Sequence, residues 1–370
     1  MCRLGLSVSI AIITVVLILS SCMENPNEGI SYQPLELNDG WKISTPEKEG
    51  VDSYRLKSVY ESAEKLKNIY SLIVVKNGFL IGERYFNGRG PLEAHPTASV
   101  TKSMISALAG IALEENILIS LDQKMMEFFP EVDWPNLDPR KSQITIRQTL
   151  QMRSGYPWEE FTGDLPLLFS RDNWIPLLEE IPLNSEPGTQ FGYSNLTAHM
   201  LAIILTRAAN ISLLSFSQTH LFDPLDIEPA FWPTDSLGYH YGSGDIELTP
   251  REMAKFGLLY LNNGIVNGSQ IIPSEWITES LTPYSYNVYN GKILTNFDLL
   301  DYGYMWWFSR AGNIQVHFAW GHGGQMILLI PDLNMVIVST ADHLPGQFGE
   351  AAWNKEKAVM ELVGRFIASL

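Results

Sequence analysis

The chain has 370 residues, of which 45% are hydrophobic, 18% charged and 11% aromatic, a composition that excludes a disordered tail, a coiled coil and a collagen-like fibre. Its 25 basic and 41 acidic residues give a net charge of −16, which argues against a nucleic-acid partner because such a protein repels phosphate backbones. Its two cysteines, Cys2 and Cys22, lie at the N-terminus, so the folded part has no disulfide, cysteine nucleophile or cysteine metal cluster.

The first residues predict a secretory signal. Arg3 precedes an uncharged apolar run over residues 4–19, and two serines then lead to Cys22. This ending resembles the lipobox of bacterial lipoproteins, and the resemblance implies cleavage before Cys22 and a lipid on its thiol. The alternative is a transmembrane anchor, since about 20 apolar residues can cross a bilayer. In either case we expect the protein to be held in the bacterial cell envelope, facing the periplasm or the cell exterior.

The chain accordingly divides into a signal peptide over residues 1–21, a tether over 22–40 and a folded domain over 41–370. The tether is rich in Glu, Asn and Pro and shows little periodicity, which predicts flexibility.

Hydrophobic periodicity predicts the elements of the folded domain. A helix over 53–67 precedes a β-hairpin over 71–86, whose turn is Asn77-Gly78, and an apolar helix over 99–115. The remaining predicted elements are helices near 121–129, 197–209 and 250–262, strands over 302–308, 314–319, 324–330 and 335–340, and a final helix over 354–369.

This order of strands, then helices, then strands predicts an α+β fold. Strands joined by short turns pair antiparallel, so the N-terminal hairpin and the C-terminal strands should form one antiparallel sheet flanked by helices. The α/β part then comprises about residues 41–115 and 296–370, and a mainly helical part of about 116–295 is inserted between them.

The helix over 99–115 carries a candidate nucleophile with its base. Lys102 is the only formally charged side chain between Ala94 and Leu113, on a helix that is apolar almost all round. Burial disfavours its charged form, and Ser99 lies one helical turn earlier on the same face. A readily deprotonated lysine beside a serine activates the hydroxyl for nucleophilic attack. The helix N-terminus adds backbone N–H donors that favour an oxyanion.

A serine three residues before a lysine is a weak signal by itself, because the spacing recurs at Ser62 and Lys65. Glu61 and Glu64 lie beside that copy, and Lys65 points away from the apolar stripe of its helix. We expect a solvated helix face there.

Tyr193 and Asn195 form a second candidate motif, on a loop that enters the helix over 197–209. A tyrosine near a lysine can pass a proton to a leaving group, and an asparagine amide can orient both the lysine and a substrate carbonyl. The same spacing follows Tyr85 and Tyr260, where a packed aromatic residue before a turn explains it.

The third candidate motif is His322-Gly323-Gly324, directly before the strand that starts at Gln325. Two glycines at the start of a strand let a ligand approach the backbone closely, so the backbone N–H of Gln325 is a candidate oxyanion donor. The alternative is a turn between strands with an incidental histidine.

The order of these motifs resembles the serine β-lactamase-like superfamily, in its class C β-lactamase, DD-peptidase and esterase branch. Stretches at 144–155, 187–191 and 242–257 look like the same family, so the resemblance spans about residues 50–365. It implies the fold predicted above, with the active site between the α/β part and the helical part.

By this resemblance Ser99 is the nucleophile, Lys102 its base and Tyr193 a proton carrier, whereas Asn195 positions the lysine and the substrate. The backbone N–H groups of Ser99 and Gln325 would form the oxyanion hole, with His322 lining the pocket. Whether Lys102 or Tyr193 takes the serine proton stays open. The implied reaction is acyl transfer through a covalent acyl-enzyme, without a metal or organic cofactor.

The third motif departs from the Lys-Thr-Gly of class C β-lactamases and DD-peptidases, whose lysine and threonine grip a substrate carboxylate. His322-Gly323-Gly324 resembles the esterase and amidase members, including the 6-aminohexanoate-dimer (nylon-oligomer) hydrolases. We therefore predict a serine hydrolase that acts on a small-molecule ester or amide.

Two alternatives remain open. One is a D-amino-acid peptidase, DD-carboxypeptidase or weak β-lactamase that acts on cell-wall peptides. The other is a catalytically inactive surface binding protein on the same scaffold, which the intact Ser99, Lys102 and Tyr193 argue against. Most of the tryptophans near the expected site should belong to the core, and the five are Trp158, Trp174, Trp306, Trp307 and Trp320.

Overall fold

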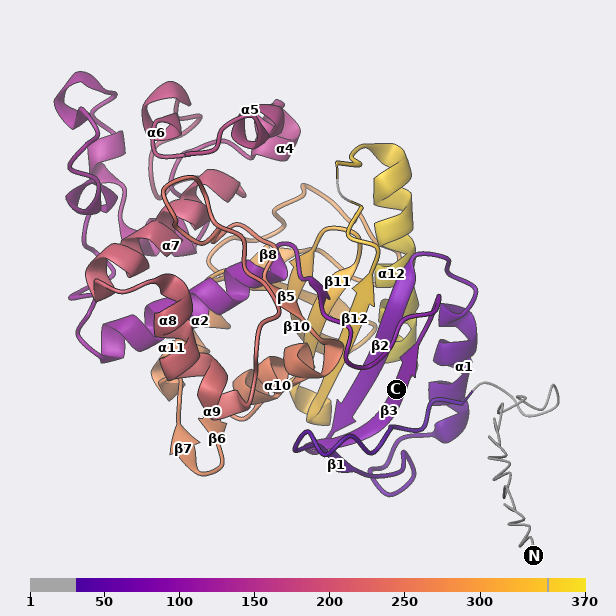
Figure 1. The fold of residues 1–370 in the computed structure, drawn as a ribbon. Helices are drawn as coiled ribbons and strands as arrows, with labels where there is room; N and C mark the ends of the chain where they lie inside the picture. Colours follow the sequence, from indigo (N-terminus) through magenta and orange to yellow (C-terminus); the bar gives the residue numbers. More distant parts are fainter. Residues whose placement is uncertain (1–30, 345) are drawn as a thin grey trace, which may run out of the picture.

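The computed structural model describes residues 31–344 and 346–370, so the predicted signal peptide and the predicted lipid on Cys22 lie outside the described residues. Within them, one eight-stranded sheet has the order β1-β3-β2-β12-β11-β10-β9-β8 (Figure 1). The strands, with the short pairs β4–β5 and β6–β7 outside this sheet, are β1 (Lys42–Ile43), β2 (Ile69–Lys76), β3 (Phe79–Tyr85), β4 (His95–Pro96), β5 (Glu247–Leu248), β6 (Ile265–Val266), β7 (Ser269–Gln270), β8 (Asp301–Tyr302), β9 (Trp307–Ala311), β10 (Ile314–Gly321), β11 (Gln325–Ile330) and β12 (Met335–Ala341).

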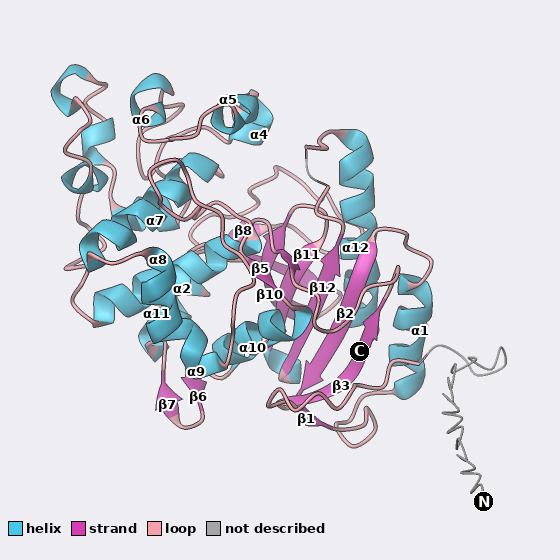
Figure 2. Cartoon of the chain, viewed as in Figure 1, coloured by secondary structure: helices cyan, strands magenta, loops and turns pink. Residues whose placement is uncertain are grey.

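Helices cover both faces of this sheet. On one face α1 packs against α12, whereas α10 lies against β2, β11 and β12 on the other, and α2 connects this layer to α7 of the helical part (Figures 1 and 2). The helices are α1 (Ser53–Ala63), α2 (Val100–Glu114), α3 (Ile146–Leu150), α4 (Glu159–Thr162), α5 (Leu165–Phe169), α6 (Leu177–Glu180), α7 (Asn195–Ala209), α8 (Leu213–Ser217), α9 (Asp223–Leu225), α10 (Pro250–Leu261), α11 (Ser274–Ser280) and α12 (Glu350–Ser369). Within residues 31–344 and 346–370 no single helix is long and apolar enough to cross a membrane. The segment 213–225 and α7, which meet at a bend of 78°, would together be long and apolar enough.

The predicted α+β fold is confirmed. The N-terminal hairpin joins the C-terminal strands through β2, which pairs antiparallel with β12. The hairpin turn falls at Asn77 and Gly78, where both residues have positive φ, as a tight hairpin turn requires. One pairing differs from the prediction, because β1 runs parallel to β3 and the sheet is therefore mixed.

The helix predicted near 121–129 is wrong, because the segment forms only a short 3₁₀ turn over Met125–Phe128. Its backbone bonds to a later segment instead. The N–H of Met125 donates to the carbonyl of Ile144 (2.8 Å), and the N–H of Arg147 donates to the carbonyl of Leu121 (2.8 Å). These bonds satisfy backbone groups that a helix would have paired internally.

The strand predicted over 302–308 is interrupted between β8 and β9. The N–H of Gly303 donates to the carbonyl of Trp306 at 2.9 Å, which closes a turn, and Met305 has a φ of 60°. Hydrophobicity did not reveal this turn because Tyr304 and Trp306 are as buried as strand residues would be.

Part of the segment predicted as a flexible tether packs against the folded body. The ring of Tyr32 stacks on Tyr60, with ring centroids 5.1 Å apart. Arg251, only 3% exposed, donates to the carboxylate of Asp39 (2.7 Å) and to the carbonyl of Leu35 (2.7 Å). A buried guanidinium is stable only with such partners, so residues 32–40 belong to the folded body.

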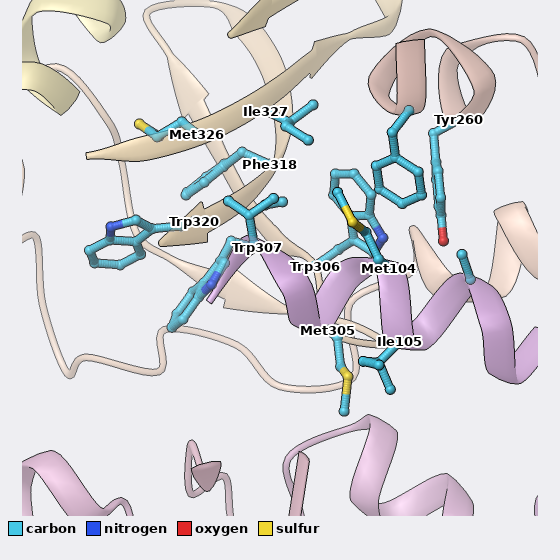
Figure 3. Packing of buried hydrophobic residues seen from close by; sticks show 14 of the residues in the cluster. Met104, Ile105, Tyr260, Met305, Trp306, Trp307, Phe318, Trp320, Met326 and Ile327 are labelled. Carbon is cyan, nitrogen blue, oxygen red and sulfur yellow. The ribbon is translucent and has the colours of Figure 1, made fainter. Parts of the chain in front are cut away.

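The core surrounds α2, whose residues 100–112 are all buried. Figure 3 shows Met104 and Ile105 of this helix close to Met305 and Trp306 of the loop between β8 and β9. The hydroxyl of Ser103 donates to the carbonyl of Met305 at 2.6 Å. At Gly110 a Cβ would lie 2.3 Å from the ring of Trp276, so only glycine allows this approach. The packing fixes α2 in place, and with it the residue at its N-terminus.

Candidate active site

Ser99 occupies the N-cap position of α2, but its side chain makes no capping hydrogen bond. An N-cap serine normally uses its hydroxyl to accept from a helix N–H. Here the hydroxyl accepts from Lys102 Nζ at 2.9 Å instead. Ala98 before it has a φ of 46°, a left-handed conformation that costs roughly 1–2 kcal/mol in a residue with a Cβ. Strain of this kind persists where the surrounding structure holds a functional residue in place.

Lys102 is 1% exposed and is bonded to three neutral oxygens. Its Nζ lies 2.9 Å from Ser99 Oγ, 2.8 Å from Asn195 Oδ1 and 2.5 Å from the carbonyl oxygen of Ser243. Burial lowers the pKa of Lys102 from 10.5 to about 8, although nearby carboxylates, led by that of Glu160, act in the opposite direction. With this pKa a minority of Lys102 is neutral at physiological pH, and that neutral fraction can accept a proton from Ser99.

Tyr193 lies beside this pair, with its ring centroid 4.8 Å from Lys102 Nζ. The residue is 5% exposed. Burial raises the pKa of Tyr193 far above its ordinary value, although the Ser99 side chain acts to lower it. The phenol is consequently protonated at rest and can give up a proton only when it receives another.

The predicted residues Ser99, Lys102, Tyr193 and Asn195 thus meet at one place, although 93 residues separate Lys102 from Asn195. The other copy of the serine–lysine spacing is on the surface. Ser62 there is half-buried and donates to the carbonyl of Ser58 at 2.8 Å, and Lys65 is exposed. The predicted distinction between the two copies therefore agrees with their surroundings.

A buried carboxylate that the sequence did not identify holds Asn195 in place. Glu159 is 0% exposed and accepts from the hydroxyl of Ser194 (2.7 Å) and from the N–H groups of Asn195 (2.8 Å) and Leu196 (3.2 Å) at the start of α7. Burial raises the pKa of Glu159 to about 7, although these hydrogen bonds lower it. The sequence offered little sign that Glu159 is buried, because it is followed directly by a second glutamate, Glu160, which is exposed. The carboxylate thus fixes the backbone of Asn195 at the start of α7, and the side-chain amide of the same residue faces Lys102.

We expect Glu159→Gln to lower the free energy of unfolding by about 1–3 kcal/mol, because a glutamine cannot accept from all three donors. Urea unfolding monitored by tryptophan fluorescence would measure this loss. Glu160→Gln is the matched control, since the exposed Glu160 carboxylate accepts only from Trp158 Nε1 among the bonds described here (2.7 Å). Equal midpoints for the two variants would contradict the role of Glu159.

Glycines bring the third motif close to the first. Gly321 ends β10 where a Cβ would lie 2.4 Å from the carbonyl oxygen of Thr97, two residues before Ser99. Gly323 has a φ of 87°, and its Cβ would lie 2.1 Å from the carbonyl oxygen of Asp342. Both positions therefore exclude side chains, for reasons of space and, at Gly323, of backbone conformation.

Gln325 is fully buried at the start of β11. Its side chain donates from Nε2 to the carbonyl of Ala341 (2.7 Å) and accepts at Oε1 from the N–H of Ala341 (3.0 Å). The side chain thus ties β11 to β12. The backbone N–H of Gln325 stays the predicted second oxyanion donor, and Gly324 before it has a φ of 104° that favours glycine.

His322 is turned toward α12 and the loop before it. Its Nδ1 lies 2.9 Å from a carboxylate oxygen of Glu356, and its Nε2 lies 3.0 Å from the carbonyl oxygen of Gln347. Its ring stacks on Phe348 with centroids 5.4 Å apart. Burial lowers the pKa of His322, but the hydrogen bond and charge of Glu356 outweigh it, so the pKa is raised.

Aromatic side chains surround Tyr193. The ring centroids of Trp158 and Trp307 lie 5.8 and 5.4 Å from that of Tyr193. Tyr289 contacts both tryptophans, at 4.9 and 6.0 Å, and Trp320 packs on Trp307 at 5.2 Å. Three of the five tryptophans singled out in the sequence therefore belong to this cluster.

The other two tryptophans, Trp174 and Trp306, are 3% and 0% exposed, and Trp307 and Trp320 of the cluster are buried as well, so four of the five belong to the core, as predicted. Within residues 31–344 and 346–370, no group of three His, Cys, Asp or Glu side chains is arranged to hold a metal ion.

The Beta-lactamase family model matches residues 48–359, most of the chain. The protein belongs to the beta-lactamase family. A 6-aminohexanoate-dimer hydrolase of Paenarthrobacter ureafaciens is 23% identical over 286 residues, which cover 72% of this chain and 71% of that protein.

Solved structures show the same fold. A candidate 6-aminohexanoate-dimer hydrolase from Bacillus anthracis superposes with a TM-score of 0.69 at 22% identity and covers 94% of this chain and 90% of that one. An octameric penicillin-binding protein homologue from Pyrococcus abyssi gives a TM-score of 0.61 at 18% identity and covers 85% of this chain and 77% of that one.

Members of the beta-lactamase family are hydrolases, so this chain is a serine hydrolase in general type. Two carboxylates that lie outside the three motifs contact residues within them: Glu159 contacts the second motif and Glu356 the third. Neither stands near its motif in the sequence, since Glu159 precedes Asn195 by 36 residues and Glu356 follows Gly323 by 33.

Proposed function

We propose that the protein is a serine hydrolase that cleaves a small, uncharged ester or amide through an acyl-enzyme formed on Ser99. The observation that carries this proposal is the contact of Lys102 Nζ with Ser99 Oγ at 2.9 Å in a buried setting. Burial lowers the pKa of Lys102 to about 8, so the lysine can act as a base. Residues 1–22, which lie outside the described residues, support a lipid anchor in the cell envelope only through their sequence.

In the proposed acylation step, neutral Lys102 takes the proton of Ser99 as Oγ attacks the substrate carbonyl carbon. The carbonyl π electrons move to oxygen, and the backbone N–H groups of Ser99 and Gln325 stabilise the resulting oxyanion. Tyr193 gives its proton to the leaving alcohol or amine as the bond to carbon breaks, and Lys102 returns a proton to Tyr193. Lys102 acts as the base here because Tyr193 is protonated at rest.

Water then completes the reaction. It attacks the acyl carbon, gives up a proton to Lys102, and the carboxylic acid leaves as Ser99 Oγ recovers a proton. Asn195 keeps Lys102 aimed at Ser99 throughout, because its Oδ1 accepts from Nζ at 2.8 Å.

The charges around the site favour an uncharged substrate. His322 is the cation of the third motif, and its Nδ1 is paired with Glu356 at 2.9 Å. Glu160 adds an exposed carboxylate, held by Trp158 Nε1 at 2.7 Å. A substrate carboxylate would therefore meet a paired cation and a like charge, both unfavourable for binding. The aromatic cluster around Tyr193 offers apolar contact instead.

A covalent probe and two substrates test the proposal on full-length protein in detergent. We expect a fluorophosphonate to add one adduct, mapped to Ser99, and p-nitrophenyl acetate to be turned over. The kcat/KM for nitrocefin, which bears a carboxylate, should be lower by at least about 10²-fold. Fast nitrocefin hydrolysis would instead establish a β-lactamase, and a folded protein with neither adduct nor turnover would be a binding protein.

A further inference from the structure

Glu356 of α12 is a buried carboxylate that the mechanism above does not use. It is 4% exposed, and three donors converge on it. Its Oε1 accepts from Trp320 Nε1 at 2.5 Å, and its Oε2 accepts from the N–H of Gly323 at 2.9 Å. The third donor is His322 Nδ1, 2.9 Å from Oε2. One carboxylate thus contacts the end of β10 and the turn that leads into β11.

The second nitrogen of His322 also faces an acceptor. Nε2 lies 3.0 Å from the carbonyl oxygen of Gln347, which has no proton to donate. A neutral imidazole carries one N–H and could satisfy only one of these two contacts. Both contacts are hydrogen bonds only when the ring carries a proton on each nitrogen, that is, as an imidazolium.

We propose that Glu356 is a positioning residue that holds the His322-Gly323-Gly324 turn in place and keeps His322 as an imidazolium. This inference rests on the proposed function, because the turn leads to the backbone N–H of Gln325. Glu356 acts through the turn and touches no reacting atom. It also neutralises the one positive charge of the third motif.

Charged groups from other elements act on His322 in the same direction. Glu160 of α4, in the helical part, raises the pKa of His322, as Glu356 does, and the charge of His322 also acts on Asp245. Of these carboxylates Glu356 makes the direct contact. Its removal should therefore produce the largest change in the protonation of His322.

Glu361 on the same helix provides a matched control. It is also a buried carboxylate, 8% exposed, and it accepts from the N–H groups of Thr295 and Asn296 and from the Asn296 side chain. Those residues lie in the loop before β8, outside the three motifs. Glu361→Gln should thus reproduce the general cost of losing a buried carboxylate on α12 without affecting His322.

The experiment compares Glu356→Gln with Glu361→Gln in the full-length protein. With ¹³Cε1-labelled histidine the seven histidines give seven NMR signals, and His322→Gln assigns the one of interest. We expect Glu356→Gln to lower the pKa of His322 by about one pH unit or more. We also expect kcat for p-nitrophenyl acetate to fall by about 10²-fold with little change in KM, because a displaced oxyanion donor weakens only the transition state.

Glu361→Gln should leave both the titration of His322 and kcat close to those of the wild type. The inference is overturned if Glu356→Gln leaves the pKa of His322 unchanged, or if the two variants lose kcat equally. A fault in the proposed function itself would show separately, because Ser99→Ala would then leave turnover intact while the titration of His322 could still be measured.

Discussion

Ser99→Ala is expected to reduce kcat for p-nitrophenyl acetate by about 10⁴-fold or more, because the acyl-enzyme cannot form without the hydroxyl. The fold should not suffer, since the Ser99 hydroxyl makes no capping bond to α2 and its partner Lys102 keeps two other acceptors. Steady-state kinetics together with intact-mass labelling would measure the effect.

Ser62→Ala is the matched control for this prediction, because it removes the hydroxyl of the other serine–lysine pair. Ser62 is on the surface of α1 and bonds only locally, to the carbonyl of Ser58. Its loss should leave kcat and labelling unchanged. Full activity in Ser99→Ala, or a loss of activity in Ser62→Ala, would show that the nucleophile had been placed on the wrong helix.

Lys102→Arg is expected to lower kcat by about 10³-fold, because a guanidinium stays charged and cannot accept the Ser99 proton. In the wild type, burial lowers the pKa of Lys102 to about 8. Below that pH the lysine carries a proton and cannot act as a base. We therefore expect kcat/KM to rise with pH and to level off above about 8, and this limb should be absent in the variant.

Lys65→Arg serves as the control, since Lys65 lies beyond the end of α1 and outside the site. Its pH profile should match that of the wild type. A pH profile of the wild type without a limb near 8, or a loss of less than about tenfold in Lys102→Arg, would move the role of base to another group.

The sequence predicted the fold where the signal was local. Two apolar runs around Asn77-Gly78 indicated the first hairpin, and hydrophobic periodicity indicated the helix that the structure shows as α10. The prediction failed where distant segments compete for the same backbone. Residues 121–129 bond to 144–147 instead of coiling into a helix, and Gly303 turns where the pattern indicated a continuous strand.

The same distinction applies to the site. The three motifs were predictable because each is a short arrangement of residues whose chemistry depends on spacing along one element, as in Ser99 and Lys102 one helical turn apart. Even the choice between the two serine–lysine pairs followed from the apolar character of the helix that carries Ser99. The sequence also showed that His322-Gly323-Gly324 departs from Lys-Thr-Gly. It did not show that Glu356 pairs with the charge of His322.

The supporting contacts came only from the tertiary structure. Lys102 bonds to the carbonyl of Ser243, 141 residues later, and Glu356 reaches back 33 residues to Gly323. The amino-acid sequence by itself thus determined which groups can carry out the chemistry, because those groups are side chains on regular elements. Only the tertiary structure decided which buried carboxylates hold them, because hydrophobic patterns record which face of an element is buried but not which polar group it meets there.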